Sequence, residues 1–104
     1  AQWHDMDIIR NDAPSELEIT DHSEAYEALL ITGPRSRDIL EPLVEGFDLQ
    51  ASWLSFQTGG TVAGVPCVLA RVSFAGELGW EVHCEAEHSP TVWDAVTAAG
   101  AKPF

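Results

Sequence analysis

The chain has 104 residues, 45% of them hydrophobic, and its 17 acidic against 5 basic side chains give a formal charge of −12. This size and composition suit one globular domain with a small core, and they exclude a fibre or a disordered chain. Nucleic acid and anionic membrane surfaces are excluded as partners by the same charge, because binding a polyanion requires basic residues that replace its counterions.

The first third of the sequence predicts one short helix and two strands. Apolar residues three to four apart predict an amphipathic helix over residues 3–10, which residues 11–14 break. Leu17 and Ile19 alternate with polar residues and predict a brief, half-buried strand. Residues 23–32 fit either a helix capped by Ser23 or a buried strand from about Tyr26. We favour the strand, because its apolar run ends directly in Gly33.

A helix should follow, beginning at Pro34, with Ile39, Leu40 and Leu43 on its apolar face and Pro42 ending it. After a loop over residues 55–60, the runs 61–63 and 65–74 read as a hairpin with its turn at Gly64.

From Leu78 to Cys84 apolar and other residues alternate, which predicts a strand with one core face. The last predicted helix has Ser89 as its N-cap and Gly100 as its terminator. These elements predict an α+β fold with a mostly antiparallel β-sheet and helices packed on one face. Residues 101–104 end without a further predicted element, so we interpret residues 1–104 as a single partial domain.

Cysteine and histidine spacing predicts no metal site. Cys67 and Cys84 stand outside any paired ligand or redox spacing, so we expect two reduced core thiols. The histidines at positions 4, 22, 83 and 88 do not share a helix or strand face as ligands would. No serine has a histidine and an aspartate at a recognisable triad spacing.

The stretch from Arg71 to Glu81 is the most informative one for chemistry. Alternation puts Glu77, Gly79 and Glu81 on one side of the strand, opposite Leu78 and Trp80. A glycine between two carboxylates leaves a flat space in which a planar ligand could approach the backbone. The alternative is a polar strand face in contact with solvent only.

Three stretches in the same order resemble one family: LITGPRSRDIL at 30–40, VAGV at 62–65 and GELGWEV at 76–82. They resemble the aminomethyltransferase (glycine cleavage T-protein) family. The last stretch looks closest to the folate domain of dimethylglycine and sarcosine dehydrogenases. The resemblance covers nearly the whole chain and implies the middle portion of a folate-binding domain of that fold.

The resemblance also implies site residues. Glu81 matches the glutamate that binds the pterin ring, whose ring N–H and exocyclic amine can both donate to one carboxylate. Phe74 stands where the family usually has a tyrosine that stacks near the pterin, so stacking is kept and the hydroxyl is lost. Phe56 corresponds to a further aromatic residue of the pocket. Gly79 completes the predicted cofactor-binding set.

The function implied is transfer of a one-carbon unit from an amine of the glycine, sarcosine or dimethylglycine type to tetrahydrofolate. The family's catalytic aspartate lies upstream of the matched region, so we name no catalytic residue and expect the isolated chain to be inactive. Folate and the amine are the expected partners. FAD would bind in a separate domain outside this chain.

Two other functions stay open. One is a folate-binding or assembly module of the same fold without transfer chemistry, which the upstream sequence would distinguish. The other is an interaction module without a ligand, for which we expect a homodimer that pairs exposed sheet edges. We expect the chain in the cytoplasm, or in the mitochondrial matrix if its source is eukaryotic.

Overall fold

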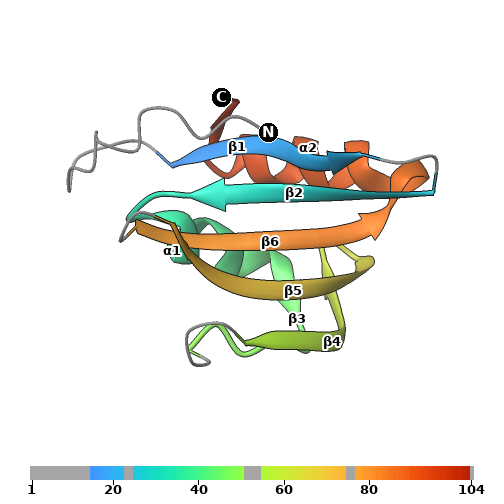
Figure 1. Ribbon diagram of the computed structural model, residues 1–104, viewed down its shortest axis with the longest axis horizontal. Coiled ribbons are helices and arrows are strands. Elements are labelled where there is room, and N and C mark those ends of the chain that lie inside the picture. Colours follow the sequence, from blue (N-terminus) through green and yellow to red (C-terminus); the bar gives the residue numbers. More distant parts are fainter. Residues whose placement is uncertain (1–14, 23–24, 51–54, 75–76, 104) are drawn as a thin grey trace.

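The computed structural model describes residues 15–22, 25–50, 55–74 and 77–103, and the predicted helix over 3–10 lies outside them. The described strands form one seven-stranded sheet in the order β3-β4-β5-β6-β2-β1-β7 (Figure 1). Their bounds are Glu16–His22 for β1, Tyr26–Thr32 for β2, Val44–Glu45 for β3, Phe56–Val62 for β4, Val65–Phe74 for β5, Glu77–Glu85 for β6 and Lys102–Pro103 for β7. Neighbouring strands are antiparallel except for the pair β1 and β7, which is parallel.

Two α-helices, α1 at Ser36–Leu40 and α2 at Ser89–Ala98, lie behind the sheet as Figure 1 presents it. Both helices contribute side chains to the same buried cluster as strands β2, β5 and β6, so they cover one face, which we call the inner face. The predicted α+β class, with helices on one face of a mostly antiparallel sheet, is therefore confirmed. No helix in the described part of the chain is long and apolar enough to cross a membrane.

The strand predicted from about Tyr26 is confirmed, because β2 is buried on both faces at five consecutive positions, 27–31. The following helix begins at Ser36 rather than at Pro34. A 3-10 turn over Glu41–Leu43 continues it, and Pro42 stands within that turn. The proline therefore ends the α-helical pattern where the sequence predicts, because it cannot donate the next backbone hydrogen bond.

The hairpin is longer than predicted. Strand β4 begins at Phe56, five positions before the predicted start, and pairs with β5 through a register shift between Gln57 and Gly60. Ala63 and Gly64 form the turn, with φ values of 54° and 80°. Both central residues of a tight hairpin turn of this hand need positive φ, which explains the glycine.

Helix α2 does not begin as predicted. Its N-cap is His88, without a side-chain cap bond, whereas the hydroxyl of Ser89 donates a hydrogen bond to the buried carboxylate of Glu27 on β2. A buried carboxylate needs such a donor more than the exposed helix end does, because burial without a partner is costly. Gly100 follows the helix with φ 127°, as expected of a terminator.

Both edges of the described sheet are two-residue strands, β3 and β7. The second of these lies at the end of the chain, where the sequence predicted no element. Short edge strands leave few unpaired backbone groups for another chain to join. The homodimer through sheet edges stays a prediction.

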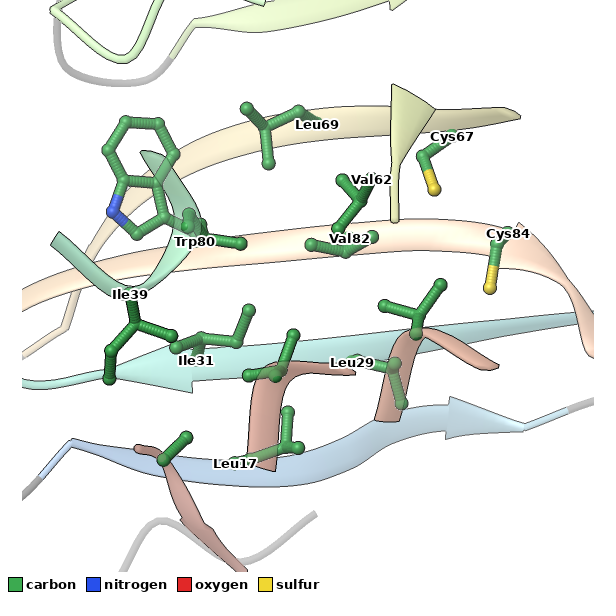
Figure 2. Close-up of a cluster of buried hydrophobic side chains, with 14 of the residues drawn as sticks. Leu17, Leu29, Ile31, Ile39, Val62, Cys67, Leu69, Trp80, Val82 and Cys84 are labelled. Atoms are coloured by element: carbon green, nitrogen blue, oxygen red, sulfur yellow. The ribbon is translucent and has the colours of Figure 1, made fainter. Parts of the chain in front are cut away.

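Cys67 and Cys84 are free and buried on the inner face (Figure 2). Burial, with the neighbouring Cys84 as the next cause, raises the pKa of the Cys67 thiol to about 12. Burial and then the charge of Glu27 raise the pKa of the Cys84 thiol as well.

These thiols should therefore react slowly with a disulfide reagent at pH 8, because only the thiolate is nucleophilic. We expect labelling of Cys67 in the folded chain to be roughly a thousandfold slower than in urea, following its thiolate fraction. The pKa of the Cys67 thiol is higher in the folded chain than in the unfolded chain. The stability that the protonated thiol contributes is therefore complete below pH 9.0 and is lost as the pH rises towards 12. Rapid labelling of both thiols without urea would contradict the burial.

Candidate functional site

Strand β6 has one side that faces the core and one side that carries polar residues. Trp80 and Val82 are fully buried and point into the inner-face cluster (Figure 2). Glu81 and His83 alternate with them and are partly exposed, with side-chain exposures of 30% and 36%. The alternation predicted for this segment is confirmed, and the Glu81 carboxylate lies on the face opposite the helices, which we call the outer face.

The strand register aligns five residues in one row across the outer face. Directly paired residues of antiparallel strands project to the same side of a sheet. Ala70 pairs with Glu81 on one side and with Phe56 on the other. On the opposite side Glu81 pairs with Leu30, which in turn pairs with Glu18. The sheet thus brings Phe56 and Glu81, which are far apart in sequence, onto the same row.

The row has an exposed aromatic ring and a partly exposed carboxylate on either side of a small, buried residue. Phe56 is 75% exposed, whereas Ala70 between it and Glu81 is 4% exposed. Two strand spacings put the backbones of Phe56 and Glu81 about 10 Å apart. Ala70 offers only a methyl group, and its low exposure shows that other parts of the chain already cover most of it. Ala70 is a residue that the sequence analysis missed, since only the register shows what stands beside Glu81.

Gly79 lies differently from what the sequence suggested. It is buried, and a side chain at this position would meet Val72 Cγ2 at 3.1 Å and Thr32 Cγ2 at 3.5 Å. These neighbouring side chains occupy the space beside the glycine. A direct contact between Gly79 and a planar ligand stays a prediction.

Phe74 is the last residue of β5 and pairs with Glu77 in the register. The side chains of these two residues lie outside what the structure describes. The stacking role of Phe74 therefore stays a prediction.

Glu81 has a polar neighbour that the sequence analysis passed over. His83 Nε2 lies 3.1 Å from Glu81 Oε1. An ionised carboxylate only accepts hydrogen bonds, so the histidine nitrogen is the donor. The signal was present in the sequence, because residues two apart on a strand share a face.

A pocket of about 310 Å³ opens beside this pair, and its walls include Tyr26, Val68, His83 and His88. Glu81 is not among its lining residues, so His83 stands between the pocket and the row. His88 also lies 3.7 Å from Glu85 Oε1 and 3.3 Å from Glu87 Oε2. These three side chains are the one grouping among the described residues that could hold a metal ion. Its carboxylates are exposed and already face the imidazole, and we assign no metal to it.

Comparison with known proteins places these features in a family context. A family model described as "GCVT N-terminal domain" matches residues 1–103. The aminomethyltransferase of Streptomyces coelicolor is 39% identical over 87 residues, which are 82% of this chain and 23% of that protein. Sarcosine oxidase subunit alpha of a Corynebacterium species is 37% identical over 102 residues, or 95% of this chain and 10% of that protein. The mitochondrial sarcosine dehydrogenase of Mus musculus is 37% identical over 102 residues, or 96% of this chain and 11% of that protein. The chain thus spans about a quarter of the first relative's length and about a tenth of the length of the other two.

Proposed function

The chain belongs to the GCVT N-terminal domain family, and from this membership we propose that it carries part of a tetrahydrofolate site in which Glu81 holds the pterin ring. In a longer protein the site would serve transfer of a one-carbon unit from an amine to tetrahydrofolate. The amine would be of the glycine, sarcosine or dimethylglycine type. The relatives' names, aminomethyltransferase and sarcosine dehydrogenase, support this class of reaction.

The observation that carries the proposal is the position of the Glu81 carboxylate. It projects from the outer face, away from the buried Trp80 and Val82, and is neither sealed in the core nor fully solvated. The pterin ring presents a ring N–H beside an exocyclic amine. One carboxylate can accept a hydrogen bond from each in a fork, and such charge-assisted pairs are strong and directional.

Phe56 supplies the second contact in the proposal. Its exposed ring lies in the same row, on the far side of Ala70, so it can stack against a flat heterocycle whose edge meets Glu81. The Phe56 ring is 75% exposed, so it keeps apolar surface in contact with water, which is unfavourable. A ligand that covers the ring removes part of this surface from water and gains binding free energy. Phe74 and Gly79 remain members of the proposed site on the family resemblance alone.

These residues bind and orient, and we assign no proton transfer to them. Bound tetrahydrofolate would supply the nitrogen atoms that accept the one-carbon unit. Holding the pterin in one orientation fixes where those nitrogens lie relative to an amine, which lowers the barrier by removing orientational freedom before the reaction.

Amide NMR of the ¹⁵N-labelled chain tests where tetrahydrofolate binds. We expect shifts that saturate with ligand at Ala70, Glu81, His83 and Phe56. The helix α2 amides, on the opposite face, should stay within error. p-Aminobenzoylglutamate, which lacks the pterin, should leave the Glu81 amide unchanged. No saturable shift, or shifts confined to α2, would refute the proposed site.

A further inference from the structure

The side chain of His83 lies within hydrogen-bonding distance of the Glu81 carboxylate. It stands two positions after Glu81 on β6, so both side chains project from the outer face. The distance from His83 Nε2 to Glu81 Oε1 is 3.1 Å, and neither side chain is more than 36% exposed. Partial burial strengthens a hydrogen bond between them, because less water competes for the carboxylate.

The two residues that pair directly with His83 on the adjacent strands have no polar side chain. His83 pairs with Val68 on β5 and with Ala28 on β2. Both are apolar, so they confine the imidazole without binding its nitrogens. On its own strand the next outward residue is Glu85, whose carboxylate lies 3.7 Å from His88. The imidazole is thereby directed along the strand towards Glu81.

The hydrogen bond leaves Glu81 free to bind a ligand. Each carboxylate oxygen has two acceptor sites, and His83 uses one of the two on Oε1. Within the described part of the chain no donor binds Oε2, and Oε1 retains one site, so a fork of two donors still fits. What the bond removes is rotation of the glutamate side chain, whose freedom would otherwise be lost on binding.

We infer that His83 is a positioning residue that holds the Glu81 carboxylate in the orientation required for a ligand with two adjacent N–H donors. This inference rests on the proposed function and adds a determinant of affinity to it. The ligand class is a fused nitrogen heterocycle with a 2-amino group beside a ring N–H.

The experiment is a calorimetric titration of tetrahydrofolate into the chain carrying His83→Leu or His83→Gln. Leucine removes the donor, and we expect the affinity to fall roughly tenfold. Glutamine keeps an N–H donor near the same place and should restore the affinity to within about threefold of the unsubstituted chain. Thermal unfolding of each variant shows whether it is folded, and Glu85→Gln serves as the surface control.

A double substitution separates positioning from direct contact. In a Glu81→Ala chain, His83→Leu should cause no further loss, because there is no carboxylate left to orient. A full tenfold loss in that background would mean that His83 contacts the ligand itself, which overturns the inference. So would unchanged affinity in His83→Leu alone, while Glu81→Ala still weakens binding and the proposed function stands. If Glu81→Ala also binds normally, both the proposed function and this inference are wrong.

Discussion

Replacing Trp80 with alanine is expected to lower the free energy of unfolding by about 3–5 kcal/mol. The indole is fully buried and lies among Ile39 and Leu69 in the core cluster (Figure 2). The guanidinium carbons of Arg37 and Arg71 lie 5.9 and 6.0 Å from the ring centroid. Removing the ring would therefore leave a large cavity and also cost two cation–π contacts.

Urea denaturation followed by circular dichroism measures this loss. Domains of this size have total stabilities of about 5–15 kcal/mol, so the alanine variant should unfold at a much lower urea concentration or be unfolded without urea. Trp80→Phe is the matched control, because it keeps an aromatic ring in the site, and we expect it to retain most of the stability. A loss below about 1 kcal/mol for Trp80→Ala would show that the β6 inner face is not packed as described.

Elements with a clear hydrophobic period could be predicted from the sequence. Strand β6 is one example, because Trp80 and Val82 must face the core while Glu81 cannot. The two-residue period then fixes which side chains share a face. This is why the outward position of Glu81 followed from the sequence alone.

Features that depend on distant partners could not be predicted. The first residues of β4, from Phe56 to Gly60, are polar or glycine apart from Phe56, and they join the sheet because β5 lies beside them. Ser89 has the residue type of an N-cap, yet its hydroxyl binds Glu27, which is 62 positions away. Local propensity cannot anticipate such a contact, since tertiary pairing overrides it.

The candidate site also contains residues that could be predicted from the sequence and others that only the structure brings together. Glu81 could be named from its motif, and His83 could have been named from its spacing to Glu81. That Phe56 lies in the same row, with Ala70 between them, depends on the register of three strands and is visible only in the structure. The burial of Gly79 beneath Val72 and Thr32 was likewise beyond the sequence, because those contacts come from neighbouring strands.

Glu81→Ala is expected to weaken tetrahydrofolate binding about a hundredfold, because it removes both acceptors of a charge-assisted fork. Glu81→Gln should lose nearly as much, since its amide nitrogen would face a ligand donor. The fold should persist in both variants, because the side chain projects from the outer face and its removal leaves no cavity in the core. Glu85→Ala, on the same strand and with a side chain 60% exposed, removes the same charge outside the row.

The dissociation constant of tetrahydrofolate, measured by calorimetry for the chain and for the Glu81→Ala and Glu85→Ala variants, tests the assignment of the ligand carboxylate most directly. We predict a rise of about a hundredfold for the first variant and less than about twofold for the second. Equal affinities for all three proteins would contradict the account, because the ligand would then be held by other residues or not recognised through its pterin.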